Sequence, residues 1–137
     1  MWDSSQSDVA RISQALERNA SGQEGEKLYK KFNGTTQEPV RLAVALRGFF
    51  LADGVTESQR EVFGAYLKRR IRPTAEALIE AEALPQLQQL EALGWLDAAL
   101  VDAFMQSAIR QRKTSVTVWL LQLKTQKYGF RDRDFTL

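Results

Sequence analysis

Apolar residues recur along much of this chain at the spacing of one face of an α-helix. Between Thr56 and Ile71 the apolar stripe is formed by Val62, Phe63, Tyr66, Leu67 and Ile71. Between Asp97 and Arg112 the same spacing returns with Leu100, Val101, Phe104, Met105, Ala108 and Ile109. Residues that are three or four positions apart share a helix face, so both stretches predict amphipathic helices.

Three further segments differ in how completely they are apolar. Val40 to Ala52 is apolar nearly all round, which is typical of a helix that neighbours cover on several sides, and we expect it to be the central helix. Asp8 to Asn19 and Gln23 to Phe32 carry only sparse apolar stripes. We expect these two to be helices packed at the edge of the fold.

The stretch TSVTVWLLQLKTQKYGF, residues 114–130, begins like a strand and ends like a basic helix. Its alternation of apolar and polar residues stops near Leu121, whereas the uninterrupted run reaches Tyr128, which is too long for an ordinary strand. The pattern favours a closing helix that Thr114 or Ser115 caps. Lys124 and Lys127 would then complement the helix dipole near its carboxyl end.

Capping signals separate these elements. Ser21 with Glu24 and Thr56 with Gln59 fit the capping box of a helix start. Helix ends are indicated at Asn33-Gly34, Asp53-Gly54, Gly94 and Gly129, and helix starts near Pro39, Pro73 and Pro85. The sequence therefore predicts an all-α chain of about seven or eight short helices, in a compact helical bundle or a short stack of antiparallel helical hairpins.

The expected domain organisation is simple. At 137 residues the chain has the size of one domain, so residues 1–137 are expected to form a single all-α domain. Residues 1–35 would supply peripheral N-terminal helices. Residues 130–137, which alternate in charge and end in Leu137, would form a flexible or docking tail.

The last third carries a family resemblance. A leucine-rich helix ends in Leu93-Gly94-Trp95, a helix follows from Asp97 to Arg112, and the last helix contains Trp119-Leu120-Leu121 and then Lys124. Over about 84–130 this arrangement resembles the degenerate, ankyrin-like helical repeats of bacterial proteins. The resemblance implies stacked helices and implies no particular ligand.

Composition narrows the possible chemistry. The chain has no cysteine and no histidine, so disulfides, thiolate catalysis, histidine-dependent triads and histidine-ligated metals are excluded within it. Neither a dinucleotide-binding nor a P-loop glycine motif occurs. Glu76 and Glu80 lie one helical turn apart, but that spacing is typical of an exposed helix face. We expect no enzyme activity, no cofactor and no metal site.

Hydropathy gives an expectation for the cellular location of the protein. No run of apolar residues is long enough to cross a bilayer, and the first residues lack the basic start and apolar stretch of a signal peptide. We therefore expect a cytoplasmic protein that does not enter a membrane.

Charge is segregated along the chain although the net charge is only +2. The stretch from Pro73 to Ile109 contains no lysine or arginine, and basic residues gather on both sides of it. Such blocks either neutralise each other when helices pack or form a surface that steers a charged partner. The residues best placed for a partner are Lys68, Arg69, Arg72, Trp95, Arg110, Arg112, Lys113, Lys124 and Lys127.

Two functions fit these observations. The first is a non-enzymatic protein-interaction module, namely an adaptor, an inhibitor or an assembly subunit, whose partner is another protein or a multi-protein complex. The alternative is a nucleic-acid-binding accessory protein that contacts phosphates through the basic clusters at helix ends. The sequence offers no small-molecule substrate.

Overall fold

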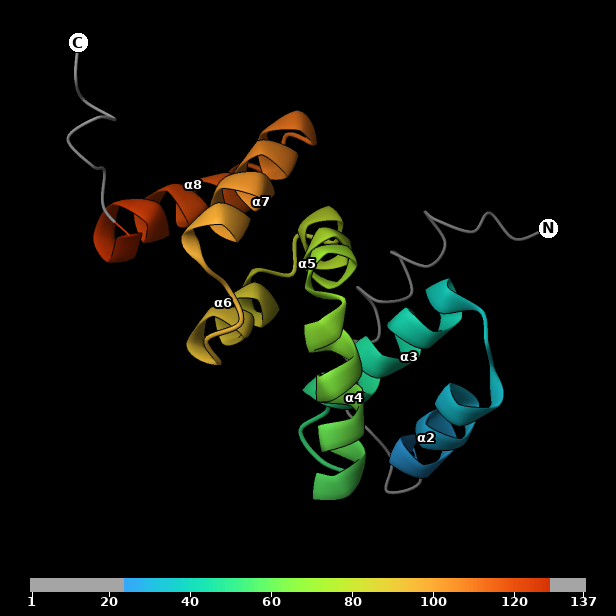
Figure 1. Cartoon of the computed structure of the whole chain (residues 1–137). Coiled ribbons are helices and arrows are strands. Elements are labelled where there is room, and N and C mark those ends of the chain that lie inside the picture. The colour runs from blue at the N-terminus through green and yellow to red at the C-terminus, as the bar shows by residue number, and fades with distance from the viewer. Residues whose placement is uncertain (1–23, 129–137) are drawn as a thin grey trace, which may run out of the picture. The chain divides into compact units, whose positions relative to one another are not determined.

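Helices account for nearly all of the described chain. The structure, a computed structural model, describes residues 24–128, and within them it contains seven α-helices, one π-helical turn and no β-strand (Figure 1). The all-α prediction is confirmed. The elements are α2 (Glu24–Gly34), α3 (Glu38–Phe50), α4 (Glu57–Arg69), α5 (Ile71–Glu80), α6 (Leu84–Ala92), α7 (Ala98–Arg110), α8 (Thr114–Leu123) and η1 (Lys124–Tyr128).

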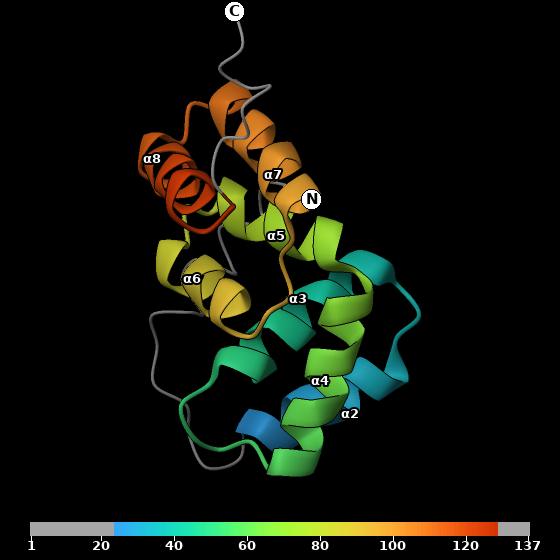
Figure 2. The same cartoon turned by 60° about the vertical axis from the view of Figure 1, so that its left-hand side comes forward.

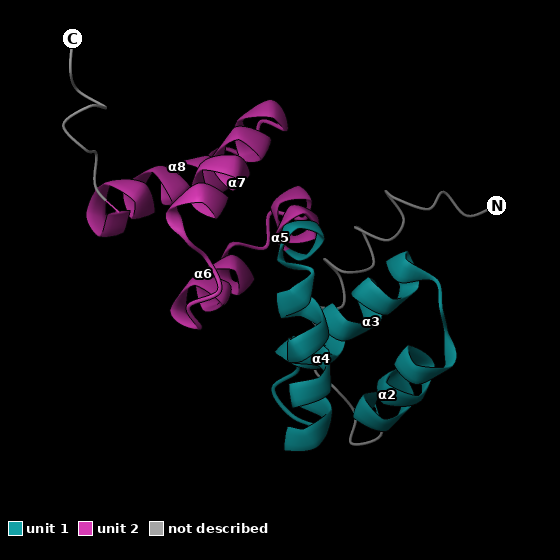
Figure 3. Cartoon of the chain, viewed as in Figure 1, with its two compact units in different colours: residues 1–74 teal, residues 75–137 magenta. Residues whose placement is uncertain are grey.

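The chain divides into two compact units, residues 1–74 and residues 75–137, which Figure 3 colours separately. The boundary falls within α5, so that helix belongs to both. The predicted helix over Asp8 to Asn19, the predicted cap at Ser21, and the predicted tail over 130–137 lie outside the described residues. Each unit is described by itself below.

Unit 1 is built around α3, which packs against both α2 and α4. Val44, Ala45, Leu46, Arg47 and Gly48 of α3 are all buried, as the nearly uninterrupted apolar run predicts. Two glycines fix how α3 crosses α4. A Cβ atom on Gly48 would lie 2.3 Å from the ring of Phe63, and one on Gly64 would lie 2.8 Å from the ring of Phe49. Each helix therefore places an aromatic ring where the other has no side chain.

Aromatic rings fill the space between α2 and α4. Phe32 of α2 makes edge-to-face contacts with Phe63 and with Tyr66, with ring centroids 5.4 and 5.1 Å apart. All three rings are at most 3 % exposed. This geometry adds attraction between the rings to the gain from burying their apolar surface.

Arginine side chains cap the carboxyl ends of two helices in unit 1. Arg41 donates from Nη1 to the carbonyls of Phe32 and Thr35, and its guanidinium lies 4.0 Å from the centre of the Phe32 ring. Arg60 donates from Nη1 to the carbonyls of Phe49 and Leu51. These bonds satisfy carbonyls that have no partner within their own helix.

The start of α4 matches the sequence pattern. Thr56 accepts a bond from the Gln59 amide, and the Gln59 side chain accepts one from the Thr56 amide, so the predicted capping box is formed. Val62 is an exception to the predicted apolar stripe, because its side chain is 36 % exposed. It lies at the edge of the face that Phe63, Tyr66 and Leu67 bury.

The same turn follows three helices in the unit 2 part of the chain. After α5 the chain turns through Glu82, and after α7 it turns through Arg112, both of which have a left-handed backbone (φ 52° and 59°). In each turn the amide of the next residue bonds the carbonyl five positions earlier, Ala83 to Leu78 and Lys113 to Ala108. This is the Schellman arrangement, which glycine usually completes. Gly94 completes it after α6, as predicted.

The structure decides between strand and helix for residues 114–128. Thr114 begins α8, which packs beside α7 (Figure 2), and π-helical η1 continues it to Tyr128. The helix prediction is confirmed, but the predicted caps are wrong. Lys113 occupies the cap position and makes no side-chain bond to the start of α8, and its own amide donates to the carbonyl of Ala108 in α7.

The described helices are also short. Among residues 24–128, none is both long and apolar enough to span a bilayer.

Candidate functional site

The predicted partner-binding residues belong to two separate units. Lys68, Arg69 and Arg72 lie at the end of α4 and the start of α5 in unit 1. Trp95 and the other five basic residues lie in unit 2. The structure therefore assigns the predicted residues to two surfaces, which we consider separately.

In unit 2, three of the basic side chains are bound to acidic residues of the same unit. Lys113 lies 4.0 Å from Glu82, Lys124 lies 3.1 Å from Asp102, and Lys127 is paired with Glu91. The carboxylates all come from the acidic stretch between Pro73 and Ile109. The hydrogen bond to Glu91 raises the pKa of Lys127 above its usual value. The charge blocks of the sequence thus partly neutralise each other when the helices of unit 2 pack.

Tyr128 completes this arrangement in η1. Its hydroxyl donates to the carbonyl of Leu96, and the ammonium group of Lys127 lies 5.6 Å from its ring centre. Lys124 and Lys127 therefore hold η1 against the preceding elements of unit 2. The sequence predicted that these two lysines complement the helix dipole. Their carboxylate partners, Asp102 and Glu91, are visible only in the structure.

Arg110 and Arg112 remain exposed at the turn after α7, and neither forms an ion pair with another described residue. Trp95 is half-buried after Gly94, and its amide donates to the Leu90 carbonyl. It covers part of unit 2 and still presents some surface.

The outward face of α8 is uncharged, and two of its exposed side chains are large and apolar. Val118 and Leu121, three positions apart, are 49 and 47 % exposed. The other exposed residues of the helix are Thr114, Ser115 and Gln122, and none of its ten residues carries a charge. Large apolar side chains are also exposed at Leu93 and Ile109 in unit 2. Sequence periodicity assigned Ile109 to the buried stripe, but its position in the last turn of α7 leaves it 52 % exposed.

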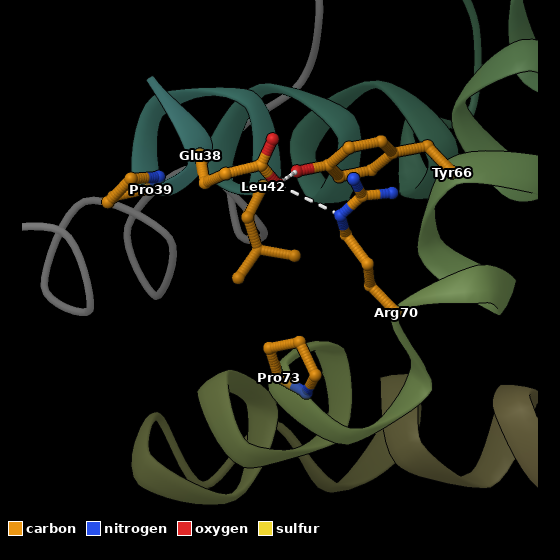
Figure 4. A pocket seen from close by; sticks show the side chains of 6 residues that line it. All are labelled: Glu38, Pro39, Leu42, Tyr66, Arg70 and Pro73. Atoms are coloured by element: carbon orange, nitrogen blue, oxygen red, sulfur yellow. Dashed lines mark hydrogen bonds and ion pairs between the residues drawn. The ribbon is translucent and has the colours of Figure 1, made fainter. Parts of the chain in front are cut away.

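In unit 1 a pocket of about 330 Å³ opens where three helices approach one another. The first turns of α3 contribute Glu38, Pro39 and Leu42, α4 contributes Tyr66, and Pro73 comes from α5. Arg70, in the bend between α4 and α5, closes one side (Figure 4). Proline and leucine side chains make the walls mostly apolar.

A hydrogen-bonded triad borders the pocket. Oε1 of Glu38 accepts a bond of 2.8 Å from the Tyr66 hydroxyl and one of 2.9 Å from Nε of Arg70 (Figure 4). The guanidinium of Arg70 also lies 4.3 Å from the centre of the Tyr66 ring. Arg70 therefore contacts both other members of the triad.

The pKa values of Glu38 and Tyr66 are displaced in opposite directions. The hydrogen bond from Tyr66, followed by the charge of Arg70, holds the pKa of Glu38 below its usual range. Burial, together with the bond to Glu38, raises the pKa of Tyr66. At neutral pH the triad therefore consists of a carboxylate, a neutral phenol and a guanidinium.

Sequence reasoning missed Glu38, Leu42 and Tyr66 as site residues. Tyr66 and Arg70 are four positions apart, which places them on one helix face, but Glu38 is 28 positions before Tyr66 and no local pattern connects them. Only the crossing of α3 and α4 brings these side chains together.

The remaining acidic residues of the described chain do not form a cluster. Glu76 accepts a hydrogen bond from the buried Ser107, and Gln111 donates to the same hydroxyl. Within residues 24–128 no three acidic side chains come together as a metal site would require.

Comparison of the chain with protein-family models, with curated proteins and with solved structures gave no match.

Proposed function

We propose that the chain is a non-enzymatic protein-interaction module that works in the cytoplasm as an adaptor, an inhibitor or an assembly subunit. The observation that carries this proposal is the outward face of α8, where Val118 and Leu121 are about half exposed on a helix without charged residues. Burying large apolar side chains against a partner is the main favourable term in protein association.

The pairing of lysines within unit 2 also supports a protein partner over a nucleic acid. Lys113, Lys124 and Lys127 already lie beside carboxylates, so binding a phosphate there would break existing ion pairs. The exposed side chains of α8 itself are apolar or uncharged polar groups. Such a composition suits a protein surface better than a phosphate backbone.

The proposed surface is tested by affinity capture from the native host with two matched variants. Leu121→Glu adds a charge at the centre of the apolar face, and Gln122→Glu adds the same charge at the adjacent exposed position. We expect a stoichiometric protein partner with the wild type and with Gln122→Glu, and its loss with Leu121→Glu. Equal capture by both variants, or no stoichiometric partner at all, would contradict the proposal.

A stack of helical repeats fits this role, because such stacks present extended binding surfaces. The proposed likeness to ankyrin-like repeats over 84–130 is supported by the matching turns through Gly94 and Arg112, which end two successive helices of that stretch.

One observation favours the nucleic-acid alternative. Lys68, Arg69 and Arg72 are exposed, and none of them is ion-paired within the described part of unit 1. If they contact phosphates, DNA or RNA should bind more weakly as salt rises, and replacing all three with alanine should flatten that dependence. Absence of binding at low salt would exclude this alternative.

A further inference from the structure

The pocket in unit 1 has no role in the proposed protein interface, and its chemistry points to a ligand of its own. Its volume of about 330 Å³ lies at the small end of the range for ligand sites, about 300–1,000 Å³. Two of its six lining residues are prolines, whose rings have no rotatable side-chain bonds, so this part of the wall is preformed. Figure 4 shows Leu42 and Pro73 on either side of the open space, with Arg70 beside it.

The polar groups at the pocket leave more donors than acceptors. The Tyr66 hydroxyl and Nε of Arg70 both donate to a single oxygen of Glu38. The two terminal nitrogens of Arg70 make no further hydrogen bond to the described residues. The Arg70 side chain is 39 % exposed, so its guanidinium is accessible from solvent.

The charged residues near the pocket are mostly positive. Among the described residues that line the pocket, Glu38 is the only carboxylate, and Arg70 already neutralises it. Arg41 adds a second guanidinium, 5.2 Å from the centre of the Tyr66 ring. Lys68, Arg69 and Arg72 follow in the adjoining part of the chain. An anion entering this region would be attracted, and a cation would be repelled.

We propose that this pocket binds a small amphipathic carboxylate. The carboxylate accepts hydrogen bonds from the terminal nitrogens of Arg70, an arrangement that suits the planar guanidinium fork. The apolar body lies between Pro39, Leu42 and Pro73. Glu38 stays bound to Tyr66 and keeps the arginine in place. A group with two negative charges fits less well, because Glu38 is close to the position of the ligand head.

Three eight-carbon probes separate charge from apolar burial: octanoate, octan-1-ol and octylammonium. Each is titrated into the full chain while backbone amide NMR spectra are recorded. We expect octanoate to shift signals of α3 and α4 around Leu42 and Tyr66 in a saturable way, and to bind about tenfold more tightly than the alcohol. The octylammonium ion should bind most weakly. Equal binding of all three, or octanoate shifts confined to residues 75–128, would overturn the proposal.

Variants identify the residue that holds the carboxylate. Arg70→Gln should reduce octanoate binding to the level of octan-1-ol, whereas Arg69→Gln, at the adjacent exposed position, should lower it by less than about twofold. Glu38→Gln keeps a side-chain oxygen that can accept from Tyr66 and Arg70 but removes the nearby negative charge, so it should strengthen octanoate binding. It also gives a separate test if Arg70→Gln fails to fold. If octanoate binds Glu38→Gln no more tightly than the wild type, or if Arg70→Gln binds it unchanged, the assignment is wrong.

This site and the α8 surface are tested by different measurements on different units. Octanoate binding can fail while Leu121→Glu still abolishes partner capture, and the reverse outcome is equally distinguishable.

Discussion

The contact between α3 and α4 allows a quantitative prediction from one added methyl group. Gly48→Ala places a Cβ atom 2.3 Å from the Phe63 ring, which is fully buried and surrounded by other aromatic rings. Overpacking of this kind costs about 1–3 kcal/mol, and the better helix propensity of alanine returns about 1 kcal/mol. We therefore expect Gly48→Ala to lower the free energy of unfolding by up to about 2 kcal/mol.

Urea unfolding followed by far-UV circular dichroism measures this change. With a slope of about 2 kcal/mol per molar urea, the midpoint should fall by up to about 1 M. Gly34→Ala is the matched control, because a Cβ atom there meets no atom within 4 Å, and it should be neutral or slightly stabilising. Hydrogen exchange should localise the loss of protection in the Gly48→Ala protein to α3 and α4.

A second substitution tests the cause. In a Phe63→Leu background the aromatic ring is gone, so Gly48→Ala should cost much less than it does in the wild type. The reasoning would be refuted if Gly48→Ala stabilised the protein as much as Gly34→Ala, or if its cost were the same with and without Phe63.

Three further predictions concern the caps and the triad in unit 1. Thr56→Ala removes the capping box and should cost about 1 kcal/mol in urea unfolding, while Ser58→Ala in the same first turn should change little; equal effects would contradict the cap. Arg60→Ala removes both hydrogen bonds to the end of α3 and should lower the free energy of unfolding by about 1–3 kcal/mol. The exposed Lys68→Ala should lower it by about 0.5 kcal/mol or less. Equal losses in the two variants would show that the two bonds contribute nothing. The folded pKa of Glu38 lies below its ordinary value of 4.5, so the contribution of Glu38 to stability is present above that pH and is lost as the pH falls through the lowered pKa. Glu38→Gln should therefore reduce the loss of stability in acid. A Glu38 carboxyl NMR signal that titrates at or above the ordinary value would refute the assignment.

The sequence predicted the elements of this fold better than the contacts between them. Helical periodicity located α3, α4 and α7, and Thr56 and Gly94 were identified as terminal residues. These signals are local, because a cap or an apolar stripe depends on residues within a few positions of each other. The turns through Glu82 and Arg112 carry no such signal, since neither residue is one that favours a left-handed backbone.

The candidate sites were predicted less completely for the same physical reason. Charge counts identified Lys113, Lys124 and Lys127, but their partners are carboxylates that the fold brings beside them. The pocket depends on Glu38 meeting Tyr66 across two helices. Its residues are ordinary in type, and only their arrangement distinguishes them.

The interlocked glycines and phenylalanines of α3 and α4 also determine how far apart the two sides of the pocket stand. Gly48 and Gly64 each accept the ring of the other helix, so neither helix can slide along its partner without driving a ring into the backbone. Glu38 and Leu42 lie on the same α3, and Tyr66 lies on the same α4, as the interlock. The width of the pocket therefore depends on Gly48, Gly64 and the rings that pack against them, although none of these residues lines the pocket. Substitutions at Gly48 or Gly64 should therefore change ligand affinity even where the lining of the pocket is intact.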